Sequence, residues 1–175
     1  MKSKENHLFY FSGYTLIELL VVLAVAGIIT IPIMTFFISN YSTYLKESNK
    51  LDVQQVARTG MDVMMTNMRK AKQSSIRIIK NTINGHTTYQ LELVIEGNIN
   101  KRYTYYLSGT NLLQKEEEQQ PSGYWGKKAA NQLMYNVKQF KVIENNDLIT
   151  ITIKIEIDGV NGYELELSNS HKIRH

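Results

Sequence analysis

The chain has 175 residues, enough for one modest domain and a membrane anchor, and its 43% hydrophobic and 21% charged residues exclude a disordered chain and a polytopic membrane protein. The formal net charge of +4 is too small to indicate a nucleic-acid partner by itself. The absence of cysteine excludes disulfides, thiolate zinc sites and cysteine nucleophiles.

The first predicted element is an apolar helix over residues 14–38. This run contains one formal charge, Glu18, and its length of about 37 Å is sufficient to cross the hydrocarbon core of a bilayer. It is too long for the apolar region of a secretory signal peptide, which spans about 7–15 residues. A plain signal anchor is the alternative, but it leaves Glu18 unexplained because a carboxylate in lipid costs about 3 kcal/mol.

The sequence Gly-Tyr-Thr-Leu-Ile-Glu at residues 13–18, followed by the apolar run, resembles the class III leader of type IV prepilins and pseudopilins. Tyr14 stands where phenylalanine is commonest. The resemblance implies that prepilin peptidase cleaves after Gly13 and methylates the amine of Tyr14. It also implies that Glu18 pairs with the N-terminal amine of a neighbouring subunit during assembly. Lys2 and Lys4 favour a leader on the cytoplasmic side of the membrane.

Two residues interrupt the apolar helix, namely Gly27 and Pro32. Proline removes a backbone donor and bends or loosens a helix. The pattern is compatible with a static kink and with a segment that melts inside a filament, and both interpretations remain open.

Residues 44–72 lack proline and have helical periodicity, which predicts one long helix from about residue 13 to about residue 73. The methionines of this segment are interpreted as packing residues in preference to an adaptable binding surface. The predicted packing face consists of Val53, Val56, Gly60, Met64, Met68 and Ala71.

Strand-type patterns follow the helix. Strands are predicted at 75–80, 88–96, 101–107, 111–115, 132–144, 148–157 and 163–167, with turns at 84–85, 145–147 and 158–162. A loop is predicted at 116–131, and a frayed tail or an added edge strand after residue 167. A long helix before a run of antiparallel strands predicts an α+β fold in which the helix packs on a sheet. The predicted divisions are a leader at 1–13, a transmembrane helix at 14–38, its amphipathic continuation at 39–73 and a β-rich head at 74–175.

A second resemblance covers the head. Residues 54–71, 103–113 and 133–140 resemble segments of the PulJ/PilW-like minor subunits of the pilin superfamily. This resemblance implies that the chain is a minor subunit.

Side chains that carry chemistry are sparse. His7, His86, His171 and His175 do not have the spacing of metal ligands, and the acidic run at 116–118 is interpreted as a solvated charge run. No catalytic constellation is present in the sequence. We therefore expect no enzyme activity, no metal and no cofactor.

One aromatic and basic cluster remains, consisting of Tyr124, Trp125, Lys127 and Lys128. Such a cluster can bind single-stranded nucleic acid by stacking and charge, or can contact a neighbouring subunit. The second use is favoured here. Nucleic acid is kept as an alternative partner.

Together these observations predict a minor pilin or pseudopilin that assembles into a filament of a pilus, type II secretion or competence machine. The expected partners are prepilin peptidase, other pilin or pseudopilin subunits, the inner-membrane assembly platform and the lipid bilayer. The expected location is the cytoplasmic membrane, with a single span and an extracytoplasmic head. The alternatives are a DNA-binding competence pseudopilin and an unprocessed single-pass receptor or enzyme.

Overall fold

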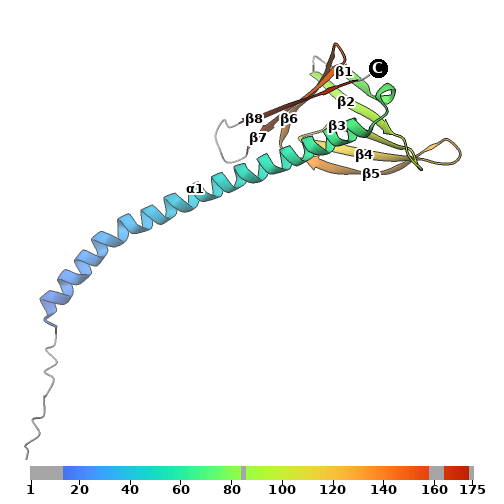
Figure 1. The fold of residues 1–175 in the computed structure, drawn as a ribbon. Coiled ribbons are helices and arrows are strands. Elements are labelled where there is room, and N and C mark those ends of the chain that lie inside the picture. The colour runs from blue at the N-terminus through green and yellow to red at the C-terminus, as the bar shows by residue number, and fades with distance from the viewer. Residues whose placement is uncertain (1–13, 84–85, 158–163, 174–175) are drawn as a thin grey trace, which may run out of the picture. The chain divides into compact units, whose positions relative to one another are not determined.

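The predicted long helix is present as α1 (Leu16–Lys70) in the computed structural model, which describes residues 14–83, 86–157 and 164–173 (Figure 1). The chain divides into two compact units, one ending at Leu45 and one beginning at Lys46, and α1 contributes to both. Every described residue of the first unit is exposed. A continuous exposed apolar helix requires another apolar medium to cover it.

The second unit contains two antiparallel sheets after a short 3₁₀ helix, η1 (Gln73–Ser75). The α+β prediction is confirmed, with the strands divided between two sheets. The first sheet has the order β1-β2-β3-β4-β5 and consists of β1 (Arg77–Ile83), β2 (His86–Ile95), β3 (Lys101–Ser108), β4 (Asn111–Gln119) and β5 (Trp125–Met134). The second has the order β6-β7-β8 and consists of β6 (Val137–Asn145), β7 (Leu148–Glu156) and β8 (Glu164–Lys172).

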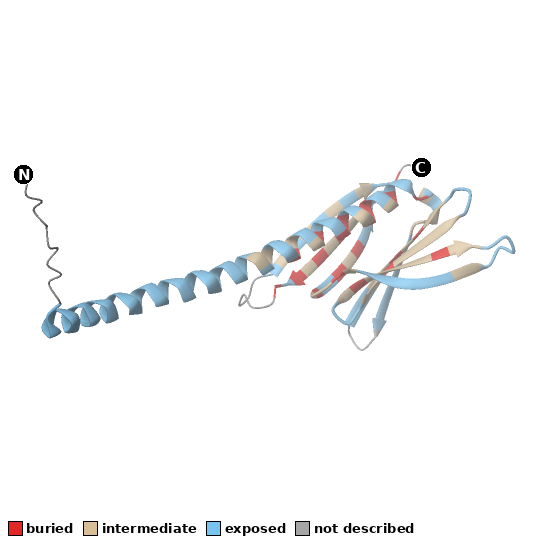
Figure 2. Ribbon diagram, turned by 90° about the horizontal axis from the view of Figure 1, so that it is seen from below, coloured by how far each residue is buried: buried red, intermediate tan, exposed pale blue. Residues whose placement is uncertain are grey.

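The core lies between the second half of α1 and the two sheets, where Figure 2 shows the buried residues. The predicted helix face is confirmed, since five of its six residues are buried and Val56 is partly buried. Ala57, Met61 and Met65 widen that face. The buried methionines fill the space between helix and strands, as flexible unbranched side chains can. Their partners in the core include Leu91, Leu93, Tyr105, Leu112, Val142, Ile151 and Ile153.

The prediction of a loop at 116–131 is wrong. Strand β4 continues to Gln119 and β5 already begins at Trp125. The acidic run belongs to β4 because a cation of a neighbouring strand lies beside each glutamate: Lys101 beside Glu116, Arg102 beside Glu117 and Lys128 beside Glu118. These cations remove the repulsion that made a loop the natural interpretation.

Among the described residues other than glycine, positive backbone φ angles occur at two places in the second unit. Asn146 and Asp147 have φ of 47° and 62°, which is the geometry of a tight hairpin turn, and the predicted turn at 145–147 is confirmed. Asn136 has φ of 56° where the chain passes from the first sheet to the second. The predicted turns at 84–85 and 158–162 lie outside the described residues.

The C-terminal segment forms an added edge strand. Strand β8 extends to Lys172 and pairs with β7 along its length, from Glu164 opposite Glu156 to Lys172 opposite Leu148. Of the two interpretations that the sequence left open, the edge strand is therefore the one observed.

Candidate functional site

The first turn of α1 is closed by the side chain of Thr15. The backbone N–H of Glu18 donates to Thr15 Oγ1 at 3.3 Å, and the N–H of Leu19 donates to the Thr15 carbonyl oxygen at 3.2 Å. Thr15 is thus the N-cap residue and Glu18 is the third helical residue, the positions that threonine and glutamate occupy in a capping box. The cap holds Glu18 in the first turn, where the positive end of the helix dipole favours a carboxylate.

Gly13, the predicted cleavage residue, lies outside the described residues. Tyr14 is the first described residue, and its side chain is 83% exposed. The predicted cleavage point and Glu18 are therefore separated by the N-cap and about one turn of helix.

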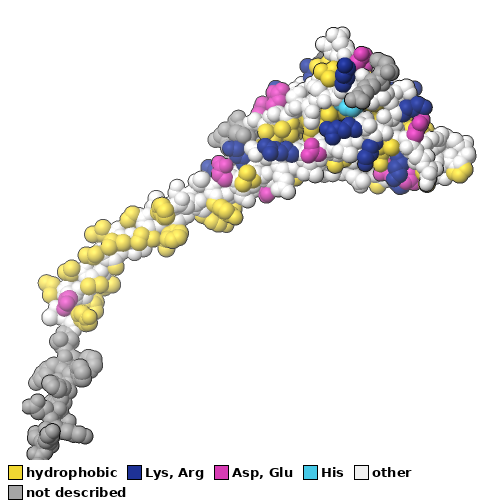
Figure 3. Space-filling model, in the orientation of Figure 1, with side chains coloured by type: hydrophobic (Ala, Val, Ile, Leu, Met, Phe, Trp, Pro, Cys, Tyr) yellow, Lys and Arg dark blue, Asp and Glu magenta, His cyan; other side chains and the backbone are white. Residues whose placement is uncertain are grey.

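After this first turn, α1 is long and apolar enough to cross a membrane. Figure 3 shows the hydrophobic side chains that cover this part of the helix. The hydroxyls of Thr30 and Thr35 donate to the carbonyl oxygens of Ala26 and Ile31, at 2.7 and 2.9 Å. Such bonds within the helix satisfy polar side chains in a medium that offers no water.

The helix continues through Gly27 and Pro32 without a change of secondary structure. A Cβ atom added at Gly27 would contact nothing within 4 Å. Local melting at these two residues inside a filament stays a prediction.

The predicted partner surface in the head is engaged in contacts of its own. The Arg102 guanidinium lies 4.6 Å from the centre of the Trp125 ring, within cation–π range. Lys128 Nζ lies 2.6 Å from Glu118 and 3.5 Å from Glu116. Tyr124 and Lys127 are exposed on the same hairpin. Because Trp125 and Lys128 already have partners, this geometry does not favour the nucleic-acid alternative.

The acidic run is an ion-paired cluster, so its interpretation as a solvated charge run is wrong. Glu117 is 4% exposed, with Arg102 Nη2 at 2.6 Å and Lys115 Nζ at 2.8 Å. Desolvation opposes the ionisation of Glu117, but the hydrogen bonds from Lys115 and Arg102 outweigh it and lower the pKa of that carboxyl. Next to it, the hydrogen bond from Lys101 lowers the pKa of Glu116.

Sequence reasoning missed the cations of this cluster, although a signal was available. The hairpin turn at Gly109 pairs Ser108 with Asn111. Counting outward from that pair places Arg102 opposite Glu117 and Lys101 opposite Glu118, as observed. Within the part of the chain that the structure describes, no group of three acidic or histidine side chains could hold a metal ion.

A membrane-anchored, single-pass protein with a β-rich head is the class that the leader sequence and the exposed apolar helix fit. Residues 9–34 match the family described as the prokaryotic N-terminal methylation motif, which is the class III signal peptide of type IV pilins. The match covers this N-terminal segment alone, and it supports a type IV pilin-like leader of the kind that prepilin peptidase processes. No curated protein and no solved structure matches the chain. The resemblance of the head to PulJ/PilW-like subunits stays a prediction.

Proposed function

We propose that this protein is a minor pilin or pseudopilin, a structural subunit that is cleaved after Gly13 and assembles through α1 into a type IV pilus-like filament. The observation that carries the proposal is the position of Glu18. Its carboxylate lies in the capped first turn of an exposed apolar helix, directly after a prepilin-type leader. Because an unpaired carboxylate in lipid is costly, this position favours pairing with a cation.

Cleavage would supply that cation. Removal of residues 1–13 leaves a free, N-methylated amine on Tyr14, which retains its positive charge. The amine of one subunit would pair with Glu18 of its neighbour, so that both charges enter the apolar interior together. The apolar surface of α1 would be covered first by lipid and then by the helices of adjacent subunits.

The head would then face the extracytoplasmic side, with prepilin peptidase and the inner-membrane assembly platform acting on the anchored helix. Within the described residues, the most buried acid, Glu117, is held by Arg102 and Lys115 in a structural cluster. This acid is therefore engaged within the head. The proposal covers filaments of pilus, type II secretion and competence machines alike.

The test is intact-mass analysis of the membrane form in cells that contain a working prepilin peptidase. The expected product begins at methylated Tyr14. Gly13→Val should block cleavage, because a branched side chain prevents the extended backbone from entering a narrow cleft. Glu18→Gln should be cleaved normally and should fail to enter filaments. Glu47→Gln, on the exposed part of α1 beyond the apolar run, is the matched control and should assemble normally. A wild-type chain that still begins at Met1 would refute the proposal.

A further inference from the structure

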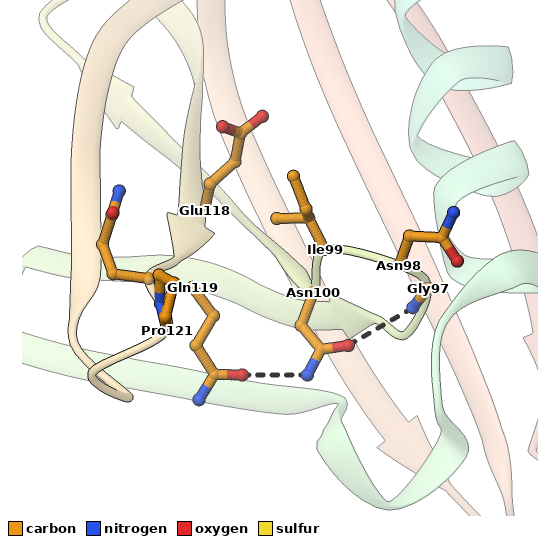
Figure 4. Close-up of a pocket in the computed structure, with 8 residues that line it drawn as sticks. Gly97, Asn98, Ile99, Asn100, Glu118, Gln119 and Pro121 are labelled. Carbon is orange, nitrogen blue, oxygen red and sulfur yellow. Dashed lines mark hydrogen bonds between the residues drawn. The ribbon is translucent and has the colours of Figure 1, made fainter.

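A small pocket lies between two turns at one end of the five-stranded sheet (Figure 4). One turn joins β2 to β3 and the other joins β4 to β5. The pocket has a volume of about 340 Å³ and is lined by residues 97–100 and 118–121. This volume is at the lower end of the range of about 300–1,000 Å³ found for ligand pockets in proteins.

Hydrogen bonds fix the two turns to each other. Asn100 Nδ2 donates to Gln119 Oε1 at 2.8 Å, and the N–H of Gln119 donates to the Asn100 carbonyl oxygen at 2.9 Å. The N–H of Gly97 donates to Asn100 Oδ1 at 3.2 Å, which closes the first turn. The dashed lines in Figure 4 mark the two side-chain bonds. A pocket held in this way does not need to be ordered when a ligand binds.

Lysines next to the pocket balance the charge of its lining. Its one charged residue is Glu118, whose carboxylate lies 2.6 Å from Lys128 Nζ and 3.4 Å from Lys101 Nζ. These two lysines also contact Glu116, so neither offers an uncompensated charge to the pocket. This balance favours a neutral ligand over an anion or a cation.

The remaining polar groups of the pocket are exposed amides. The side-chain amides of Asn98 and Gln120 make no hydrogen bond within the described residues. Each amide can both donate and accept, which matches vicinal hydroxyls and N-acetyl groups. Gly126 makes room for the Gln120 amide, since a Cβ at Gly126 would lie 2.9 Å from Gln120 Nε2.

One apolar side chain lines the pocket, and a second lies on the adjoining β4–β5 turn. Ile99 is 55% exposed in the pocket lining, and Tyr124, on the turn that carries Gln120, is 68% exposed. An aromatic ring with a polar hydroxyl suits a ligand that has both apolar C–H faces and hydroxyl edges. Neutral sugars combine these two surfaces.

We propose that this pocket binds a neutral oligosaccharide that carries hydroxyl and N-acetyl groups. The amides of Asn98 and Gln120 recognise the polar edges of one or two sugar rings, and Ile99 and Tyr124 contact their apolar faces. The Asn100–Gln119 pair positions the turns and does not itself need to touch the sugar. The proposal rests on the head alone and is independent of filament assembly.

The test uses the full chain in dodecylphosphocholine micelles and the probe tetra-N-acetylchitotetraose. Trp125 is the one tryptophan in the sequence and lies opposite Gln119 in the β4–β5 register, next to the turn that carries Gln120, so its fluorescence is used to follow binding. The expected result is a saturable change in Trp125 emission as the probe is added. The absence of a saturable change would overturn the proposal.

Variants locate the binding. Asn98→Ala and Gln120→Ala should each raise the Kd at least fivefold, and so should Tyr124→Ala. Gln132→Ala removes an exposed amide of β5 outside the pocket and should leave the Kd unchanged. All of these side chains are exposed, so folding is not at risk, and far-UV circular dichroism checks it. A Kd that none of the three pocket variants alters would place any binding elsewhere and would also overturn the proposal.

Discussion

Gly60 of α1 and Met134 at the end of β5 approach so closely that a side chain on Gly60 has no space. A Cβ atom there would lie 2.5 Å from Met134 Cε and 2.9 Å from Met134 Cγ. Met134 is completely buried, so its side chain cannot move aside without displacing other core residues. This contact sets how closely the helix packs on the first sheet.

Gly60→Ala is therefore expected to destabilise the head. Alanine in place of glycine favours a helix by about 1 kcal/mol, but overpacking of a core costs about 1–3 kcal/mol. We expect a net loss in the free energy of unfolding, measured by denaturant titration of Trp125 fluorescence. The control Thr59→Ala, at the adjacent exposed position, should be neutral or slightly stabilising. In a Met134→Ala background the cost of Gly60→Ala should disappear, and an unchanged cost would contradict the packing argument.

A second prediction concerns the buried hydroxyl of Tyr105, which is paired with Asn67. Asn67 Nδ2 donates to Tyr105 Oη at 2.7 Å, and the Tyr105 side chain is fully buried. Asn67→Ala leaves that hydroxyl without this partner and should cost about 1–3 kcal/mol in unfolding free energy. Tyr105→Phe removes the buried hydroxyl, so that no group there requires the Asn67 amide as a partner. The double variant should therefore be more stable than the sum of the single effects predicts. Additive effects in this cycle would show that the bond is not a coupled pair.

The same tyrosine predicts a loss of stability in alkali. Burial raises the pKa of Tyr105 above its ordinary value of 10.0. The unfolded chain therefore ionises first, and the stability that the neutral hydroxyl contributes is present below pH 10 and is lost as the pH rises further. The free energy of unfolding should decline more steeply above pH 10 in the wild type than in Tyr105→Phe. Equal slopes in the two proteins would contradict this assignment.

The sequence predicts the parts of this fold that depend on local pattern. The packing face of α1 follows from a period near 3.6, and β7 follows from alternation between Leu148 and Glu156. The strand character of residues 116–118 depends instead on cations that are 15 residues away along the chain, as in the pair Arg102–Glu117. A pattern confined to a short window cannot report such pairs. The candidate site divides in the same way: the leader motif is readable from sequence, whereas the pocket depends on how two turns meet.

The ion-paired carboxylate of Glu117 predicts a loss of folding stability in acid. Its pKa is lowered in the folded protein, so its contribution to stability is present above the unfolded value of 4.5 and is lost as the pH falls through the lower folded pKa. Glu117→Gln should cost about 1–3 kcal/mol at pH 7, and the difference from the wild type should shrink as the pH falls below 4.5. Glu96→Gln removes an exposed pair with Lys72 and should cost no more than about 1 kcal/mol. A loss at pH 7 no larger than that of the control would show that the buried cluster adds nothing to stability.

Variants of the N-cap residue Thr15 test the geometry of the first helical turn without changing the charge of Glu18. Thr15→Ala removes the acceptor of the Glu18 N–H but keeps the carboxylate, and N-cap losses of this kind cost about 1 kcal/mol. The amide of Glu18 should therefore exchange with solvent about fivefold faster in lipid bicelles, as measured by hydrogen–deuterium exchange. Thr15→Ser retains a hydroxyl and should exchange like the wild type, and the amide of Leu51 in mid-helix should be unchanged in all three proteins. If the proposed pairing of Glu18 requires a fixed first turn, Thr15→Ala should also enter filaments less efficiently than Thr15→Ser while being cleaved equally well. Equal exchange in Thr15→Ala and wild type would mean that the observed bond does not hold the turn, and the positioning of Glu18 would then need another cause.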